Sequence, residues 1–261
     1  MPLVSGPSAR TPDFDGRLSV VVPVRDEAGS VAALVAEIDA TLAGLRDCEI
    51  IYVDDGSRDA TAEALARAQQ AHPRLRVVRH EESCGQSAAI RSGVAAARFP
   101  WVATLDGDGQ NDPADIPRLL EALAPGRRAP GLELVAGWRA ERRDSWLRRL
   151  SSRVANAVRG TLLGDRTPDT GCGLKLFGRE LFLALPWFDH MHRFLPALVL
   201  REGAVVRSVV VRHRERKAGR SKYGVHNRLW VGIVDLFGVM WLMRRARRPR
   251  IVSKDSSNET V

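Results

Sequence analysis

Trp101-Val-Ala-Thr-Leu105-Asp-Gly-Asp-Gly-Gln-Asn-Asp-Pro113 joins a short apolar run to an acidic, glycine-rich segment. The apolar run predicts a buried strand that delivers the acidic residues at its carboxyl end. There Asp106, Asp108 and Gln110 offer oxygen atoms at alternate positions, and Mg²⁺ or Mn²⁺ prefers such ligands, often together with substrate phosphates. The alternative is an acidic turn without a ligand. An EF-hand is disfavoured, because asparagine and proline occupy the positions of its glycine and bidentate glutamate.

The chain ahead of this segment alternates short β-branched runs with stretches of helical periodicity, which is typical of βαβ units. Ser30 is the predicted N-cap of the first helix. Behind residue 113 the pattern continues with further strands and helices. The predicted strands span residues 18–23, 48–53, 75–78, 101–105, 132–137 and 204–211, and the predicted helices 30–42, 59–70, 85–97, 144–159, 177–185 and 194–200. The sequence therefore predicts an α/β fold with a mainly parallel central sheet flanked by helices.

Three polar loops follow predicted strands, at residues 23–27, 54–57 and 106–112. Ligands of open α/β sheets bind where such loops converge outside the carboxyl ends of the strands, so we expect one site there. A nicotinamide-binding domain is disfavoured, because the first loop, Pro23-Val-Arg-Asp-Glu27, lacks the Gly-x-Gly-x-x-Gly pattern.

The composition narrows the class of protein and of partner. A net charge of +9 and a pI near 10.4 call for an acidic partner, and the basic residues gather in segments 139–159, 207–222 and 244–250. Only three cysteines occur, widely spaced, which argues against a disulfide framework or a thiolate zinc site and favours a reducing, cytosolic compartment. Residues 1–16 lack the apolar core of a signal peptide.

Six sequence blocks together carry a resemblance to a known family. They are Val22-Pro-Val-Arg-Asp-Glu27, Val53-Asp-Asp-Gly-Ser-Arg-Asp-Ala-Thr61, Gly85-Gln-Ser-Ala-Ala89, Asp106-Gly-Asp-Gly-Gln110 with Pro113, Asp169-Thr-Gly-Cys-Gly-Leu-Lys175 and His213-Arg-Glu-Arg-Lys-Ala-Gly-Arg-Ser-Lys-Tyr223. In this order they resemble glycosyltransferase family 2, in particular its dolichol-phosphate mannose synthase and polyprenyl-phosphate glycosyltransferase branch, whose fold is GT-A. The resemblance covers residues 18–223.

The resemblance implies a metal-dependent, inverting transfer from a nucleoside diphosphate sugar of the GDP-mannose or UDP-hexose type. The first loops would hold the donor nucleotide, and the acidic segment would hold Mg²⁺ or Mn²⁺, with Asp108 and Gln110 as the preferred direct ligands. Where the family usually has an aromatic residue and an asparagine, this chain has Arg25 and Asp26, so the base is left open. The donor residues are Pro23, Arg25, Glu27, Asp54, Asp55, Gly85, Gln86 and Asp106; a helix cap or turn is the alternative for Asp54 and Asp55.

The acceptor decides which catalytic groups are needed. A hydroxyl acceptor needs a general base, whereas a lipid phosphate is already an anionic nucleophile and needs positive charge to hold it. Family members that act on hydroxyls often have a Glu-Asp pair where this chain has Met191-His-Arg-Phe194. Its absence favours dolichyl or polyprenyl phosphate over a glycan or lipid hydroxyl, which stays the alternative. The implied catalytic residues are Asp106, Asp108, Arg214 and Arg216. A solvated basic loop is the alternative for the basic residues. The implied phosphate ligands are Lys175, Arg214, Arg216, Arg220, Ser221 and Lys222.

The apolar run at residues 229–243 is too short as a helix to span a bilayer. Trp230, Trp241 and the basic residues 244–250 suit an anionic membrane surface, so we expect a C-terminal interfacial helix on the cytoplasmic face. A buried terminal helix or a homo-oligomer contact is the alternative. The expected division is a mobile segment 1–16, a GT-A domain 17–223, a membrane-surface segment 224–250 and a mobile tail 251–261.

Two other classes of protein compete with an enzyme. A nucleic-acid-binding module fits the net charge, but tyrosine and phenylalanine are scarce and the presumed binding edge carries three acidic loops, so no nucleic-acid partner is expected. A catalytically silent lipid-surface protein would bind vesicles without binding sugar nucleotides.

Overall fold

The computed structural model describes residues 14–123, 133–140, 159–215 and 225–246, and for residues 225–229 it describes the backbone only. Outside these ranges lie residues 1–13 of the predicted N-terminal segment, the whole predicted tail 251–261 and the predicted phosphate ligands Arg216, Arg220, Ser221 and Lys222. Of the predicted helix 144–159 only Arg159 is described, at the start of a helical stretch that runs to residue 163.

One seven-stranded sheet organises the described residues, in the order β3-β2-β1-β4-β6-β5-β7. The strands are β1 (Arg17–Val24), β2 (Asp47–Asp55), β3 (Leu75–His80), β4 (Trp101–Thr104), β5 (Glu133–Trp138), β6 (Lys175–Gly178) and β7 (Val205–Val210). β6 runs antiparallel to β4 and β5, while the other neighbours are parallel. The predicted mainly parallel α/β sheet is confirmed.

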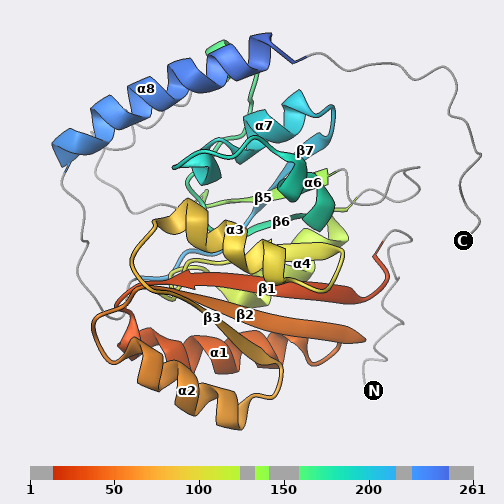
Figure 1. Ribbon diagram of the computed structural model, residues 1–261. Coiled ribbons are helices and arrows are strands. Elements are labelled where there is room, and N and C mark those ends of the chain that lie inside the picture. Colours follow the sequence, from red (N-terminus) through yellow and green to blue (C-terminus); the bar gives the residue numbers. More distant parts are fainter. Residues whose placement is uncertain (1–13, 124–132, 141–158, 216–224, 247–261) are drawn as a thin grey trace, which may run out of the picture.

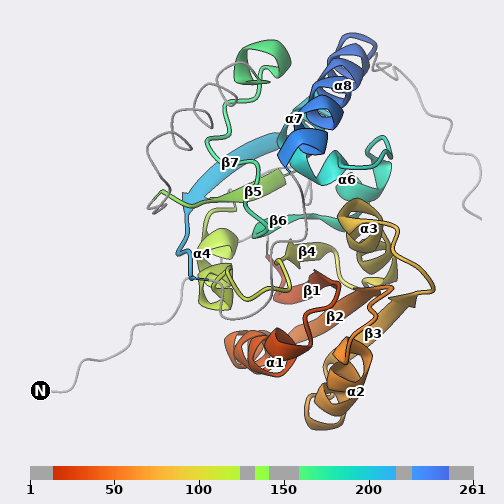
Figure 2. The ribbon, with the colours of Figure 1, turned by 90° about the vertical axis from the view of Figure 1, so that its left-hand side faces the viewer.

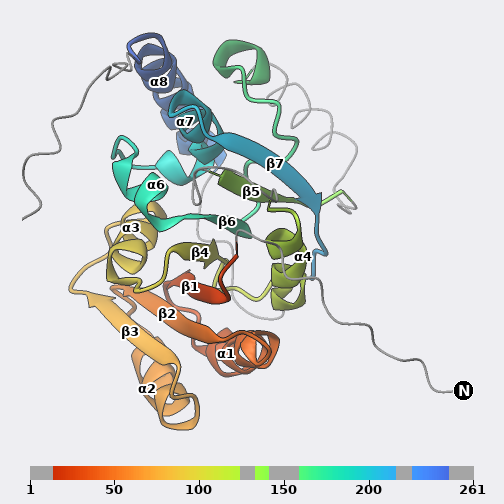
Figure 3. The same cartoon turned by 90° about the vertical axis from the view of Figure 1, so that its right-hand side faces the viewer.

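Helices cover both faces of the sheet, so its central strands β1, β2 and β4 are buried on both sides and have continuous apolar runs. Because successive side chains of a strand point to opposite faces, Val20 and Val22 of β1 pack in one core while Val21 packs in the other. Figures 2 and 3 look along the sheet and show α1 and α4 on one side, with α3 and α6 on the other. The helices are α1 (Ala28–Leu42), α2 (Thr61–Ala71), α3 (Gln86–Ala96), α4 (Ile116–Glu121), α6 (Arg179–Ala184), α7 (Leu195–Arg201) and α8 (Val225–Arg244), with the short 3-10 helices η1 (Pro113–Asp115) and η2 (Met191–Arg193).

Two local predictions were wrong. The helix predicted at 177–185 includes the end of β6, because a short, fully buried apolar run has no periodicity that separates a strand from a helix. Ser30 does not cap α1, which begins at Ala28 behind Glu27. The Ser30 Oγ instead lies 2.9 Å from the carbonyl oxygen of Glu27 and 2.6 Å from that of Gly107, so it ties the first turn of α1 to the segment after β4.

A buried carboxylate stabilises the edge of the sheet opposite the polar loops. Glu49, near the start of β2, accepts hydrogen bonds from Ser19 Oγ at 2.8 Å, from the Arg98 backbone N–H at 2.7 Å and from the Arg76 guanidinium at 2.6 Å. Burial alone would raise its pKa, but these donors outweigh burial and lower it. The ionised form is therefore favoured in the folded protein.

This cluster predicts an acid-sensitive contribution to stability. The contribution is present above the pKa of glutamate in the unfolded chain and is lost as pH falls through the lower pKa of the folded state. We expect Glu49→Gln to lower the free energy of unfolding by about 1.5–3 kcal/mol near neutral pH, the usual worth of hydrogen bonds to a charged group. Denaturant titrations from neutral pH down to pH 3 should show the two proteins converging, and a constant difference at every pH would contradict the role of Glu49.

Candidate active site

The three polar loops predicted to converge do lie against one another at the carboxyl ends of β1, β2 and β4. The backbone N–H of Asp26 donates to Ser57 Oγ at 2.9 Å, and the Asp26 carboxylate accepts from the Arg58 N–H at 2.7 Å. Ser30 joins α1 to Gly107, as described above. The loops after β1, β2 and β4 thus form one connected edge, as the sequence predicted.

The two aspartates at the end of β2 have different surroundings. Asp54 is fully buried, accepts from the Ser57 N–H at 3.0 Å and pairs with Arg79 at 3.4 Å, which matches its alternative role in a turn. Asp55 accepts from His80 Nδ1, Ser83 Oγ, Cys84 N and Gly85 N at 2.8–3.0 Å. Burial would raise the pKa of Asp55, but these hydrogen bonds lower it. Asp55 therefore holds the segment that leads into α3.

Arg25 reaches this segment from the first loop. Its Nη1 donates to Ser83 Oγ at 2.8 Å, so the predicted donor residues Arg25, Asp55 and Gly85 lie around one short stretch of backbone. Of the other predicted donor residues, Pro23 lies near the end of β1 and Glu27 directly before α1, and both are half-buried.

The acidic loop, residues 106–112, begins two residues beyond β4 and has an internally ordered backbone. Asn111 Oδ1 accepts from the Asp106 N–H at 3.1 Å, and Asp108 Oδ1 accepts from the Gln110 N–H at 3.0 Å. Gln86, the first residue of α3, donates from Nε2 to Asp106 Oδ1 at 2.9 Å. The predicted metal ligands are half-buried and lie beside the predicted nucleotide residue Gln86.

Gly173, in the segment that leads into β6, lies directly against the Asp106 carboxylate. A Cβ at Gly173 would come within 2.3 Å of the Asp106 carboxyl carbon, so only glycine leaves room for that carboxylate. The Gly173 backbone is fixed, because its carbonyl accepts from Thr104 Oγ1 at 2.7 Å. Burial, and then the charge of Asp108, raises the pKa of Asp106. Asp106 is thus a carboxylate whose ionised form gains from a nearby cation.

Lys175 is one of two basic residues whose charges act on the Asp106 carboxylate. It is buried on β6, its Nζ donates to the Cys172 carbonyl, and burial lowers its pKa. A second cation, Arg139, holds Asp169 with two parallel bonds of 2.7 and 2.9 Å. The sequence did not assign a role to Arg139 or Gly173. Gly173 lay within the family-like block 169–175, and Arg139 was only the first residue of the basic segment 139–159. Lys175 lies close enough to Asp106 for their charges to interact, and its role at an acceptor phosphate stays a prediction.

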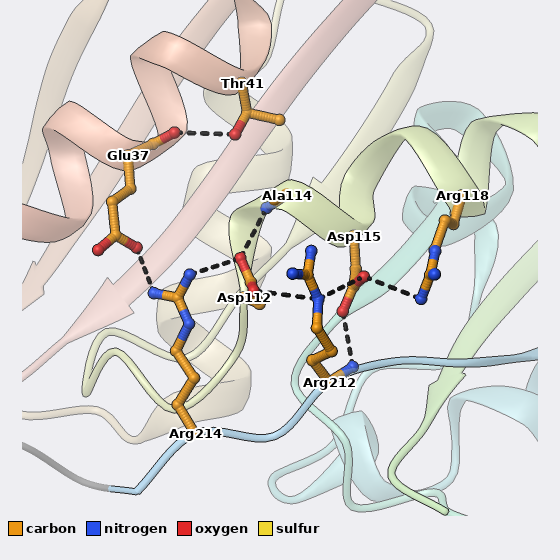
Figure 4. A network of polar contacts seen from close by, with 8 residues as sticks. All are labelled: Glu37, Thr41, Asp112, Ala114, Asp115, Arg118, Arg212 and Arg214. Atoms are coloured by element: carbon orange, nitrogen blue, oxygen red, sulfur yellow. Dashed lines mark hydrogen bonds and ion pairs between the residues drawn. The ribbon is translucent and has the colours of Figure 1, made fainter.

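The basic segment, by which we mean the family-like block 213–223, begins directly beside the acidic loop. Asn111 and His213 form an antiparallel β-bridge, and the Arg214 N–H donates to the Gln110 carbonyl at 3.0 Å. The Arg214 guanidinium contacts Glu37 at 2.5 Å and Asp112 at 2.6 Å, while Arg212 lies 3.2 Å from Asp112 and 3.3 Å from Asp115 (Figure 4). Arg214 thus fastens the start of the basic segment to α1 and to the acidic loop.

The position where a general base would be expected holds a weakly basic histidine. His192 of η2 is packed against α3, with its Nδ1 2.7 Å from Ser87 Oγ. Burial, with a smaller contribution from Lys175, lowers the pKa of His192 to about 3. An efficient catalytic base has a pKa near the working pH, so His192 is poorly suited to take a proton from a hydroxyl.

Helix α8 lies across α7 at one end of the molecule (Figure 1). Its Val239 is buried, and its Asp235 contacts His190 at 3.3 Å. Trp230, Val234, Phe237 and Trp241, at helical spacing on another side, are 60–70% exposed. Within the described residues, no helix has both the length and the apolar character needed to cross a membrane.

Comparisons with known proteins identify the family. The family model for Glycosyl transferase family 2 matches residues 19–185, more than half of the 261 residues. Over 240 residues the chain is 39% identical to the dodecaprenyl-phosphate galacturonate synthase of Rhizobium johnstonii, covering 89% of this chain and 69% of that protein. Over 211 residues it is 36% identical to the undecaprenyl-phosphate 4-deoxy-4-formamido-L-arabinose transferase of Edwardsiella ictaluri, covering 80% of this chain and 63% of that protein.

Solved structures agree on the fold. Glucosyl-3-phosphoglycerate synthase from Mycobacterium tuberculosis, in complex with Mn²⁺, UDP and glucosyl-3-phosphoglycerate, aligns with a TM-score of 0.61 at 21% identity, over 89% of this chain and 81% of that one. Mannosyl-3-phosphoglycerate synthase from Rubrobacter xylanophilus aligns with a TM-score of 0.62 at 20% identity, over 90% and 76%.

The chain belongs to glycosyl transferase family 2 and has the GT-A fold, which confirms both predictions and the prediction of a glycosyltransferase. It spans about two thirds of the length of the curated relatives named above.

Proposed function

We propose that this protein transfers a sugar from a nucleoside diphosphate sugar to a polyprenyl phosphate at the cytoplasmic surface of a membrane. The observation that carries the proposal is the backbone bridge between Asn111 and His213, which puts the basic segment beside the acidic loop. A donor diphosphate on one and an acceptor phosphate on the other would then meet at a single edge of the sheet. The names of the curated relatives, which transfer sugars to dodecaprenyl or undecaprenyl phosphate, support this acceptor.

The donor assignment follows the loops after β1, β2 and β4. Asp55 and Arg25 order the segment before α3, and Gln86 links that segment to Asp106. We assign the nucleoside to this region and the diphosphate to the acidic loop. Because Asp54 is fully buried, we assign it to the support of the turn rather than to direct contact.

The acidic loop suits a hard divalent cation. Asp106, Asp108 and Gln110 supply only oxygen ligands, and the raised pKa of Asp106 marks a carboxylate that gains from positive charge. Mg²⁺ or Mn²⁺ bound there would stabilise the negative charge that develops on the nucleotide leaving group. Gly173 leaves room for the Asp106 carboxylate, and Lys175 offsets part of its charge from below.

Gly173 provides a geometric test of this assignment. We expect Gly173→Ala to displace the Asp106 carboxylate, weaken Mn²⁺ binding and lower sugar transfer about tenfold to hundredfold, since small misplacements of catalytic groups have effects of that size. Gly171→Ala is the matched control, because its Cβ would lie 3.4 Å from Arg139 Nη2, its nearest neighbour. Calorimetric titration with Mn²⁺ and a transfer assay measure both effects. Equal Mn²⁺ affinity in the two variants would refute the assignment.

For the acceptor, we propose that Arg214 anchors the basic segment while Arg216, Arg220, Ser221 and Lys222 hold the lipid phosphate. Arginine forks bind phosphate oxygens in pairs, and lysine adds a point charge. A phosphate nucleophile needs no proton removed, which agrees with the low pKa of His192. Hydroxyl transfer would require a base that residues 191–194 do not supply.

The exposed apolar face of α8 (Trp230, Val234, Phe237 and Trp241) is the proposed membrane contact. Tryptophan favours the headgroup boundary, and Arg244 and Arg245 at the end of the helix suit anionic lipid. The acceptor is itself a membrane lipid, so this contact would bring the basic segment to its substrate.

A paired assay tests the proposed function. Purified protein is supplied with a panel of sugar nucleotides and Mn²⁺, and with vesicles that contain either polyprenyl phosphate or the corresponding polyprenol. We expect lipid-linked sugar only with the phosphate, and calorimetry with the same panel identifies the base. Transfer to polyprenol would establish the hydroxyl alternative, and vesicle binding without nucleotide binding would establish a silent lipid-surface protein.

A further inference from the structure

A second group of side chains that could hold a metal ion comes from β2, β3 and the segment before α3. Asp55 ends β2, His80 ends β3 and Cys84 lies two residues before α3. One oxygen, one nitrogen and one sulfur of these residues lie within 4.8 Å of one another. Asp55 and His80 are separated by 25 residues, and Asp55 and Cys84 by 29. No short motif marks such a set, which is why cysteine spacing argued against a zinc site.

The donor atoms of this group select a different cation from the acidic loop. A thiolate and an imidazole prefer zinc and other borderline or soft ions, whereas an all-oxygen set prefers Mg²⁺ or Mn²⁺. Zinc sites that are not purely structural usually have three protein ligands, with water or another molecule in the fourth position. Cys84 is exposed, so an ion can enter from solvent, while Asp55 is buried at the back of the group.

The surroundings already orient the ligands. His80 Nε2 lies 2.9 Å from Ser92 Oγ, so its Nδ1 faces Asp55 Oδ1 at 2.8 Å. Ser83 Oγ and the Gly85 N–H hold the other carboxylate oxygen of Asp55. Partners of this kind fix the tautomer and direction of metal ligands, and they contribute to affinity. At 2.8 Å a hydrogen bond joins the facing nitrogen and oxygen. A zinc ion with bonds of about 2.0–2.2 Å to each would replace that proton after the two atoms move slightly apart.

We propose that Asp55, His80 and Cys84 bind one Zn²⁺ per chain, and that zinc bound there competes with the donor nucleoside. The second part rests on the proposed function, because it takes the segment before α3 as the nucleoside site. Zinc would replace the hydrogen bond from His80 to Asp55 and fix Cys84. Asp55 and residues 83–85 could then no longer adjust to the nucleobase of the donor. Zinc would thus act as an inhibitor, separate from the metal that the acidic loop holds.

Direct zinc binding tests the first part without reference to activity. Reduced, metal-free protein is titrated with Zn²⁺ against a chromophoric chelator, and with Co²⁺ to detect sulfur-to-cobalt charge transfer. We expect one tight site with that absorption in the wild type and in Cys48→Ser, whose half-buried thiol lies elsewhere. Cys84→Ser should lose the absorption and bind Zn²⁺ at least tenfold more weakly, and His80→Gln should also bind more weakly. Equal affinity in Cys84→Ser, or no charge-transfer band in the wild type, would overturn the site.

A nucleotide titration with and without one equivalent of Zn²⁺ tests the second part. We expect zinc to weaken binding in the wild type and not in Cys84→Ser, which excludes an effect through the acidic loop. Zinc binding with unchanged nucleotide affinity would overturn the inhibitory role alone. A protein that binds zinc but no sugar nucleotide would refute the proposed function and leave the zinc site standing.

Discussion

Asp108→Ala is expected to lower sugar transfer by about 100- to 1,000-fold while the fold stays intact. The reason is that metal-ion stabilisation of developing charge is worth several kcal/mol, and each 1.36 kcal/mol is about tenfold in rate. Asp108 is half-buried in the acidic loop and is one of the proposed metal ligands. Its Oδ1 accepts a hydrogen bond from the Gln110 backbone N–H. Single-turnover transfer at saturating donor and Mn²⁺ measures the loss of the chemical step.

The matched control is Asp47→Ala at the start of β2, at the other end of the sheet, where the carboxylate is about half exposed. This change should leave transfer unaltered. Circular dichroism and thermal unfolding confirm that both variants are folded. Unchanged transfer in folded Asp108→Ala protein would remove the acidic loop from the reaction and with it the assignment of the metal site.

Replacing Trp230, Phe237 and Trp241 of α8 with serine is expected to abolish binding to anionic vesicles. All three are 60–70% exposed on one side of the helix and make little contact with the rest of the protein, so the fold should be retained. Burial of a large apolar side chain is worth about 1.5 kcal/mol or more, so the triple change should lower partitioning by roughly three orders of magnitude. Sedimentation with vesicles measures this, and nucleotide affinity should stay the same.

Trp138→Ser is the control, because Trp138 is a partly exposed tryptophan on β5 rather than on α8. Vesicle binding that survives the triple change would show that the membrane contact lies elsewhere. A change from oligomer to monomer, without loss of vesicle binding, would instead assign this face of α8 to a contact between copies of the chain.

Sequence reasoning was strongest where local pattern and tertiary structure agree. The apolar runs of β1 and β2 are buried on both sides and were found directly, and the loops that follow them converge because parallel strands end at one edge. β6 was missed, since residues 175–178 are too few to show a period and the strand is antiparallel to both neighbours. The architecture thus followed from periodicity, while this reversal of direction depended on tertiary packing.

The chemistry of single residues was less predictable, because the partners of a charge are distant in sequence. Arg214 stays a predicted phosphate ligand, and the structure adds a contact with Glu37, 177 residues away, that the sequence could not indicate. Lys175 stays a predicted acceptor residue, and its pairing with Thr104 brings it near enough to Asp106 for their charges to interact. Asp235 of α8 contacts His190, a partner 45 residues away that the sequence does not indicate. In each case the residue type was informative and its partner was supplied by the fold.

The chemical nature of the bond in the product distinguishes sugar transfer to a lipid phosphate from transfer to a hydroxyl most directly. Lipid product made from sugar nucleotide and polyprenyl phosphate is isolated and treated with mild acid. We expect complete release of the sugar, because the product is a sugar phosphodiester, and no product without the lipid phosphate. A product that survives mild acid, formed equally well on a lipid without phosphate, would contradict the account.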